Sequence, residues 1–200
     1  MLRGSKVHIA TSRPVGDRCI ALAKSWGANL VGMDECDIFI SVMYDKLIDE
    51  AFIGSKRRCV NFHPGLLPKY RGSGAYSWAI INGEDETGVT LHEIDVSIDN
   101  GPIIAQSKFD IYPIHTAGDL FRKAEEYILS MFQQYWNVIL SGDYRTRPQD
   151  ESKARIYYRR DLELQKDLTK YVRAFTFPGK ESAYYRNLRG EKVYIPYEQL

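Results

Sequence analysis

The residues best suited to chemistry lie in two short segments, 61–72 and 96–102. Asn61 and His63 stand two apart where a predicted strand ends, so their side chains share one face while Phe62 points into the core. Asp99 lies in a predicted loop downstream and would reach the histidine if that loop folds over the sheet edge. Because ligands of open α/β sheets bind beyond the carboxyl ends of strands, Asn61 and His63 are predicted to lie at a binding site.

Together these three side chains would suit the attack of an amine on a carbonyl group. A carboxylate beside a histidine fixes its tautomer and raises its basicity, so the histidine or its partner takes the amine proton. The amide donates to the oxygen that gains negative charge. A zinc site of His63, His92 and Asp99 is the rival interpretation, but the sequence lacks the paired histidines or cysteines usual for zinc. We therefore predict no metal.

Strands and helices alternate along the part of the chain that must position these residues. Apolar runs predict strands over 6–11, 29–33, 38–44, 58–62, 87–94 and 102–112. Helical spacing and turn residues predict helices over 14–27, 45–54, with Asp45 as its N-cap, and 75–82. Thr116 and Asp119 predict a capping box for a long helix that ends at Gly142. The pattern is typical of an α/β fold with a Rossmann-like, mostly parallel sheet and flanking helices.

The last sixty residues differ from this core in composition. A helical pattern covers 161–175, and a hairpin-like stretch covers 184–195 around Arg189 and Gly190. We predict a catalytic core of residues 1–142 and a C-terminal extension, residues 143–200, that packs on it. The hairpin also offers an edge through which a homodimer could form.

Composition excludes several classes of protein. The chain has 200 residues, and 27 Lys plus Arg against 26 Asp plus Glu give a formal net charge of +1. This balance gives no support for a general binder of nucleic acid or membrane surfaces. No run approaches the roughly 18 apolar residues of a membrane helix. Three cysteines without CxxC spacing argue against a disulfide framework, and residues 1–10 lack an apolar signal segment, so we expect a cytoplasmic protein.

The segment 61–72 (NFHPGLLPKYRG) resembles the signature of the folate-dependent formyltransferases. The similarity continues through 78–83 (WAIING), 86–92 (ETGVTLH) and 98–106 (IDNGPIIAQ). The resemblance implies transfer of a formyl group from 10-formyltetrahydrofolate to an amine, with Asn61, His63 and Asp99 as the catalytic residues. One departure is Gly65, where many members of the family have serine.

The resemblance also implies where the substrates bind. The pterin of the folate would lie against the backbone of two flanking runs, Val42, Met43, Tyr44 and Asp45 in one and Asp95, Val96 and Ser97 in the other. Four residues are predicted to contact the acceptor. They are Lys69, Tyr70 and Arg71, whose arginine offers a two-pronged donor for phosphate, and His92 on the strand that leads to Asp99.

The tail favours one branch of this family. Residues 154–162 (ARIYYRRDL) and 172–179 (VRAFTFPG) are similar to the tails of the sugar N-formyltransferases, which act on amino-deoxy sugars attached to a nucleoside diphosphate. The initiator-tRNA branch would carry a further domain, for which too few residues remain after the core. We therefore predict an enzyme that formylates the amino group of a nucleotide-linked amino sugar.

Three alternatives stay open. A glycinamide ribonucleotide-type formyltransferase is disfavoured by the loop 11–17, which has a single glycine where a glycine-rich phosphate loop is expected. A 10-formyltetrahydrofolate hydrolase would use the same three residues but usually carries an additional domain. A non-catalytic binding module of the same fold is disfavoured because it has no need for all three residues.

Overall fold

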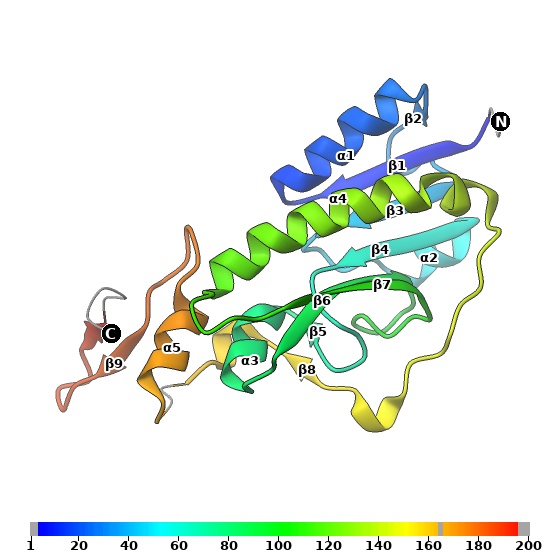
Figure 1. The fold of residues 1–200 in the computed structure, drawn as a ribbon. Helices are drawn as coiled ribbons and strands as arrows, with labels where there is room; N and C mark the ends of the chain where they lie inside the picture. The colour runs from blue at the N-terminus through cyan, green and yellow to red at the C-terminus, as the bar shows by residue number, and fades with distance from the viewer. Residues whose placement is uncertain (1–3, 164–165, 196–200) are drawn as a thin grey trace.

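A mixed six-stranded sheet forms the centre of the computed structural model, which describes residues 4–163 and 166–195. Its strand order is β2-β1-β3-β4-β6-β7 (Figure 1). The strands β2, β1, β3 and β4 pair in parallel, whereas β6 and β7 join the sheet through antiparallel pairs. The predicted Rossmann-like, mostly parallel sheet with flanking helices is confirmed.

The helices and strands follow the predicted alternation closely. The first part of the chain contains β1 (Lys6–Thr11), α1 (Pro14–Ser25), β2 (Asn29–Leu30), β3 (Ile38–Val42), α2 (Glu50–Ser55) and β4 (Arg58–His63). The middle contains β5 (Arg71–Gly72), α3 (Ala75–Ile81), β6 (Glu86–Glu93), β7 (Ile103–Asp110) and α4 (Ala117–Ser141). The C-terminal part contains η1 (Glu151–Lys153), β8 (Ile156–Tyr157), η2 (Arg159–Asp161), α5 (Leu168–Phe175), β9 (Tyr184–Arg186) and β10 (Lys192–Tyr194).

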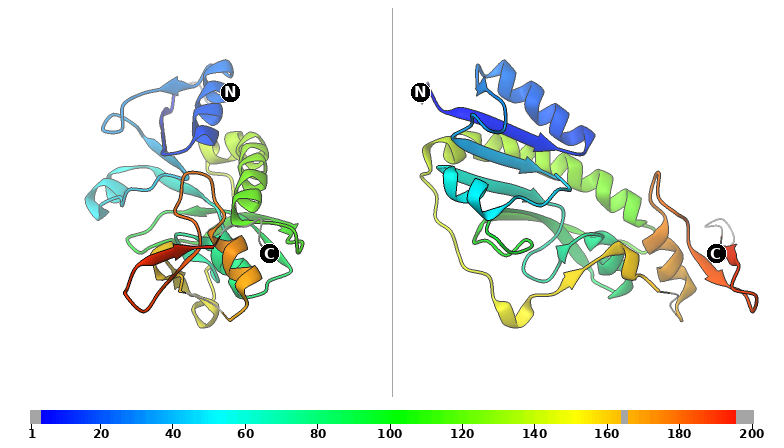
Figure 2. Two further views of the ribbon diagram at one scale, coloured as in Figure 1. Left: turned by 90° about the vertical axis from the view of Figure 1, so that its left-hand side faces the viewer. Right: turned by 180° about the vertical axis from the view of Figure 1, so that it is seen from behind.

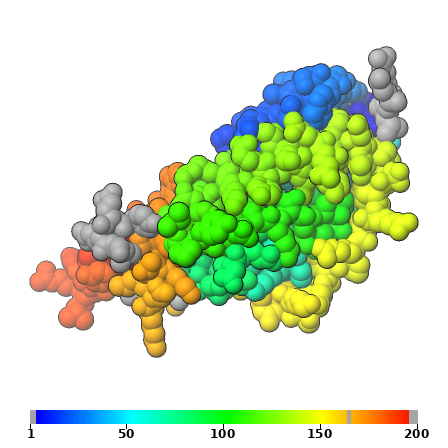
Figure 3. All heavy atoms as spheres, viewed as in Figure 1, coloured from blue at the N-terminus to red at the C-terminus, as the bar shows by residue number. Residues whose placement is uncertain are grey.

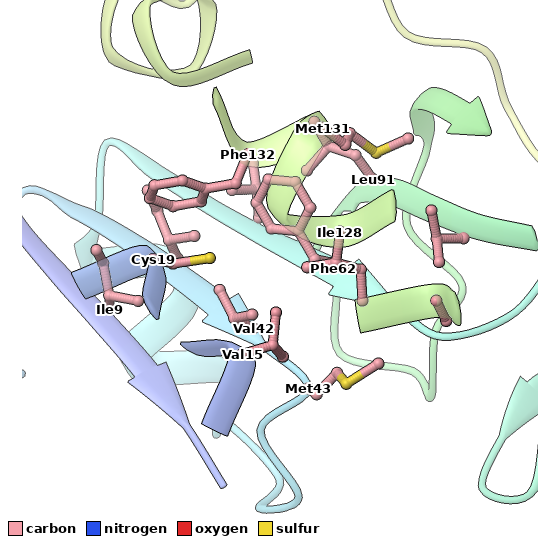
Figure 4. Packing of buried hydrophobic residues seen from close by; sticks show 14 of the residues in the cluster. Ile9, Val15, Cys19, Val42, Met43, Phe62, Leu91, Ile128, Met131 and Phe132 are labelled. Atoms are coloured by element: carbon pink, nitrogen blue, oxygen red, sulfur yellow. The ribbon is translucent and has the colours of Figure 1, made fainter. Parts of the chain in front are cut away.

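The main core lies between the sheet and the long helix α4, which runs across it beside α1 (Figures 1 and 2). Ile128 and Phe132 of α4 meet Phe62 of β4 and Leu91 of β6 in the interior (Figure 4). These four side chains are fully buried, so burial of apolar surface fixes the strand that carries Asn61 and His63. The predicted capping box is present at Thr116, and the helix ends at Gly142 in the left-handed conformation.

One predicted helix begins later than expected. The sequence suggested Asp45 as the N-cap, but α2 begins at Glu50, because the Asp49 carboxylate accepts a hydrogen bond of 2.8 Å from the backbone N of Phe52. Asp45 instead accepts a hydrogen bond of 2.6 Å from the hydroxyl of Ser12, which follows the neighbouring parallel strand β1. A long-range contact therefore decided which aspartate caps the helix.

The chain after α4 returns along the molecule, and its strand β8 pairs in parallel with β5 (Figures 1 and 2). Here the predicted helix over 161–175 is wrong in its first half. Residues 159–161 form a short 3-10 turn, and α5 begins only at Leu168, where the Asp167 carboxylate accepts from the backbone N of Lys170. Residues 164 and 165 of that range lie outside the described residues.

The predicted C-terminal hairpin is present as the antiparallel pair β9 and β10. It projects from the body of the molecule, at the lower left of the space-filling view (Figure 3). The part of the extension before the hairpin packs on the core. The Ser77 hydroxyl donates a hydrogen bond to the carbonyl of Ala174, and the Trp78 indole donates one to the carbonyl of Tyr158. Within the described ranges, no helix is long and apolar enough to cross a membrane.

Candidate active site

Asn61 and His63 lie at the carboxyl end of β4, between a parallel neighbour and an antiparallel one. Asn61 is paired with Ser41 of β3 on one side and with His92 of β6 on the other. Residues paired in this way point to the same face, so three polar side chains form a row across the sheet. His63 is on the same face two residues further along β4.

Asp99 comes to this row from the loop after β6, as the sequence suggested. Its Oδ1 lies 3.3 Å from the Nδ2 of Asn61, and its Oδ2 lies 3.4 Å from the Nδ1 of His63. The backbone N of Gly72 donates a further hydrogen bond of 2.9 Å to Oδ2. The three predicted catalytic side chains therefore meet at one point.

The orientation of His63 is set by a backbone carbonyl. Its Nε2 lies 2.7 Å from the carbonyl oxygen of Tyr70, which can only accept, so Nε2 carries a proton. The nitrogen that faces Asp99 is therefore Nδ1. Gly65 leaves room for this arrangement, because a Cβ at position 65 would lie 2.8 Å from Nε2.

Burial and charge act in opposite directions at this pair. Burial lowers the pKa of His63 below its ordinary 6.5, although the charge of Asp99 opposes the shift. At Asp99, burial alone would raise the pKa, but the attraction of His63 and hydrogen bonds to the carboxylate outweigh it and hold the pKa well below its usual range. Near neutral pH the site thus presents an ionised carboxylate beside a histidine whose Nδ1 lone pair can accept a proton.

The loop that carries Asp99 is held from the C-terminal extension. The amide Nε2 of Gln149 donates hydrogen bonds of 2.8 Å to the carbonyl oxygens of both Asp99 and Gly101. The Oε1 of Gln149 in turn accepts from the guanidinium of Arg71 at 2.9 and 3.0 Å, and Glu151 pairs with the same guanidinium at 2.7 Å. Asp99 therefore depends for its position on residues fifty places later in the chain.

A cavity of about 530 Å³ opens beside these groups. Six of the seven residues predicted to flank the pterin line it, namely Met43, Tyr44, Asp45, Asp95, Val96 and Ser97. Val42 does not line it, because its side chain is fully buried in the main core (Figure 4). The cavity is also lined by Asn61, His63, His92 and Asp99.

Three residues predicted to contact the acceptor, Lys69, Tyr70 and Arg71, do not line the cavity, so their contact with the acceptor stays a prediction. Lys69 pairs with Glu84, and the Tyr70 hydroxyl donates to the same carboxylate at 2.9 Å. Arg71 is buried, and its guanidinium donates hydrogen bonds to Gln149 and Glu151. Lys69 and Tyr70 thus join their loop to the segment after α3, and Arg71 joins it to the extension.

Sequence reasoning missed several residues of the cavity. Ser41 could have been noticed in the sequence, because it is the one hydroxyl in the apolar run 38–42. In the structure it lies beside Asn61. Six more are brought to the cavity only by long-range folding, from the loop after β1, from α4 and from the extension. They are Arg13, Phe121, Tyr158, Arg159, Phe177 and Lys180. In the described part of the chain, no group of three His, Cys, Asp or Glu side chains is arranged to hold a metal ion.

Comparison with known proteins agrees with this geometry. The family model described as formyl transferase matches residues 23–133, which is more than half of the chain. The GDP-perosamine N-formyltransferase of Brucella melitensis is 30% identical over 181 residues, covering 86% of this chain and 67% of that enzyme. The chain belongs to the formyl transferase family, and sugar N-formyltransferases are among its homologues. The methionyl-tRNA formyltransferase of Kosmotoga olearia is 37% identical, but the match spans only 38% of its length.

Solved structures share the fold over most of the chain. WlaRD, a sugar 3N-formyl transferase crystallised with dTDP and 5-N-formyl-THF, has a TM-score of 0.76 and 25% identity, covering 86% of this chain and 80% of its own. A 4-N formyltransferase from Francisella tularensis has a TM-score of 0.77 at 20% identity, covering 96% of both chains. The second comparison shows the fold alone, and it includes the C-terminal extension.

Proposed function

We propose that this protein transfers the formyl group of 10-formyltetrahydrofolate to the amino group of a nucleotide-linked amino sugar. The observation that carries the proposal is the meeting of Asn61, His63 and Asp99 at the wall of one cavity, where the Asp99 carboxylate lies 3.3 Å from the Asn61 amide and 3.4 Å from the His63 ring. That arrangement offers an N–H donor, a basic nitrogen and a carboxylate to a single reacting group. The homologous GDP-perosamine enzyme and the dTDP bound to WlaRD support the choice of acceptor class.

The lining of the cavity suits both substrates. It includes apolar residues, and Leu47 and Val96 expose 87% and 66% of their surface, which suits the flat rings of a folate. Arg13 and Lys180 contribute positive charge to the same lining, which suits the phosphates of a nucleotide-linked sugar.

The proposed reaction forms one C–N bond and breaks another. The uncharged amine of the sugar attacks the formyl carbon, and Asn61 donates its N–H to the formyl oxygen as negative charge develops there. The Nδ1 of His63, facing the ionised Asp99, accepts the proton that the amine loses. The bond between the formyl carbon and the folate nitrogen then breaks, and that nitrogen takes the proton from His63. The products are the formamido sugar and tetrahydrofolate, so atoms and charge balance.

A panel of amino-sugar nucleotides incubated with the protein and 10-formyltetrahydrofolate tests this function. We expect one sugar to gain the mass of a single formyl group while an equal amount of tetrahydrofolate appears. The control is the same sugar nucleotide with its amine acetylated. Tetrahydrofolate released without any amine would identify a hydrolase, and transfer to glycinamide ribonucleotide alone would identify that acceptor. No release with any amine would point to a binding module and overturn the proposal.

The organisation of the chain belongs to the same proposal. We take residues 1–142 as the catalytic core and 143–200 as an extension that completes the site, which is supported by the bonds from Gln149 to the Asp99 loop. A cytoplasmic location is supported by three buried free thiols, which a reducing compartment maintains. A homodimer through the C-terminal hairpin is supported by the exposed side chains of Tyr185, Leu188 and Tyr194. Sedimentation of the wild type beside Leu188→Asp tests that assembly.

A further inference from the structure

The amide of Asn61 is held at both ends by its neighbours in the sheet. The Ser41 hydroxyl lies 2.6 Å from the Oδ1 of Asn61, and the Nδ2 of Asn61 lies 3.1 Å from the Nε2 of His92. Ser41 and His92 are almost fully buried, and the three side chains belong to three adjacent strands in register. The row is therefore a continuous chain of hydrogen bonds across the rigid centre of the sheet.

His92 determines which atoms donate and which accept along this row of hydrogen bonds. The Nδ1 of His92 lies 2.7 Å from the carbonyl oxygen of Glu93, which can only accept, so Nδ1 carries a proton and donates. Nε2 then holds a lone pair and accepts from the Nδ2 of Asn61. If the amide were turned over, its Oδ1 would face that lone pair and also the carboxylate of Asp99, two acceptors at once. Electrostatic repulsion excludes that orientation.

The Ser41 hydroxyl has a different part in the chain. A hydroxyl donates and accepts, so it would bond to either end of the amide and cannot choose between them. In the orientation that His92 selects, it donates to Oδ1 and holds the amide plane in place. The two N–H bonds of Nδ2 then point at His92 and toward Asp99, where the distance is the longer 3.3 Å. The second N–H is the one that a substrate oxygen can take over.

We infer that Ser41 and His92 are positioning residues: they hold the Asn61 amide so that one N–H faces the reacting group beside Asp99. The consequence for turnover rests on the proposed function, whereas the hydrogen-bond chain itself does not. A preorganised donor needs no rearrangement when charge develops on the oxygen, so the effect falls on the transition state and not on substrate binding.

Ser41→Thr and Ser41→Val form a matched pair of nearly identical shape that differ in one hydroxyl. We expect the threonine variant to stay within about threefold of the wild-type kcat and the valine variant to lose about 10- to 100-fold, the usual cost of removing an orienting partner. KM for both substrates should stay unchanged, because this hydroxyl is engaged with the Oδ1 of Asn61. Equal kcat values for the two variants would overturn the role of Ser41.

His92→Gln and His92→Phe form the second pair. Glutamine can offer an acceptor near the position of Nε2, whereas phenylalanine removes the acceptor and keeps a ring. We expect the glutamine variant to keep a kcat at least several-fold above that of the phenylalanine variant at similar KM values. Equal loss in both, or a loss confined to KM, would show that His92 acts by shape or by binding.

An NMR measurement on the wild-type protein separates failure of this inference from failure of the proposed function. The ring carbon and nitrogen shifts of His92 should report a proton on Nδ1, and the Asn61 side-chain amide protons should exchange slowly with solvent. In Ser41→Val those protons should exchange faster. A proton found on Nε2 of His92 would overturn the inference whatever the assay shows. A wild type without transferase activity, but with these signals, would overturn only the proposed function.

Discussion

Asn61 and Asp99 meet at the same point of the cavity but are held there by two differently built regions. Asn61 belongs to a central strand whose backbone is hydrogen-bonded on both sides, by β3 and by β6. Asp99 belongs to a loop and has a φ of 49°, in the left-handed region that few residues other than glycine, asparagine and aspartate adopt. Its place depends on Gly72 from β5 and on Gln149 from the extension.

The difference shows that the sheet and the C-terminal extension contribute to the site in different ways. The sheet supplies a fixed row of polar groups, since its strands are anchored by the buried core that includes Phe62 and Leu91. The extension supplies adjustable contacts that bring the carboxylate to that row. Substitutions in the sheet should therefore change the donor itself, whereas substitutions in the extension should change only how well Asp99 is held.

The largest effect is expected from Asn61→Ala. It removes the donor to the formyl oxygen, and loss of one such donor typically costs about 100- to 1,000-fold in kcat. The fold should remain intact, but the unfolding midpoint should fall modestly, because the buried Ser41 hydroxyl and His92 ring each lose a hydrogen-bond partner. Asn137→Ala, at an exposed position of α4, is the control. Near wild-type formyl transfer by Asn61→Ala would contradict the role assigned to the amide.

A smaller loss is expected from Gln149→Ala, which removes both hydrogen bonds to the Asp99 loop. Each bond contributes on the order of 1 kcal/mol, so kcat should fall about tenfold. Gln134→Ala, on the exposed face of α4, is the matched control and should leave kcat unchanged. If steady-state kinetics show equal activity for the two variants, the extension does not position Asp99.

Two buried threonines of β6 allow a comparison within the sheet. The Thr90 hydroxyl donates to the carbonyl of Gly65 and accepts from the backbone N of Leu67, whereas the Thr87 hydroxyl finds no partner among the described residues. Thr90→Val should lower the free energy of unfolding by about 1–3 kcal/mol, and Thr87→Val should raise it by about 1 kcal/mol. Urea denaturation measures both values, and shifts of the same sign would refute the comparison.

The smallest effect concerns the titration of His63. Burial places its pKa below 6.5, and the charge of Asp99 partly opposes that shift. NMR titration of the free enzyme should give a midpoint below 6.5. Asp99→Asn removes the opposing charge, so the midpoint should move lower still, and protonation of the base should begin only at a more acidic pH. A midpoint that rises in Asp99→Asn would mean that the carboxylate does not face the ring as described.

The two regions also differ in how far the sequence predicts them. Asn61 and His63 follow from alternation in a strand with an apolar neighbour, which is a local pattern, and the strand exists as expected. The loop around Asp99 is recognisable as a turn, but its bonds to Gln149 join residues fifty positions apart. No periodicity carries that information, so Gln149 and the cavity face of Arg159 were not predicted.

Arg71 shows the same limit of sequence-based prediction, here for a residue that was predicted to bind substrate. A basic residue after the catalytic strand suggests a phosphate ligand, and only the folded chain shows that its guanidinium is buried against Gln149 and Glu151. Ser41 was within reach of prediction, because a lone hydroxyl in a buried strand needs a hydrogen-bond partner. Its partner is identified only when the register of β3 against β4 is known.

The root of the Asp99 loop has a consequence for redesigning the enzyme. A Cβ at Gly101 would lie 1.8 Å from the carbonyl oxygen of Glu93, and the backbone N of Glu93 donates to the carbonyl of Pro102, so the loop is closed tightly at its base. Its tip is free, with Val96 largely exposed. A library that varies or lengthens residues 96–98 would therefore reshape the rim of the cavity and its choice of ligand, while the carboxylate stays in register with the sheet.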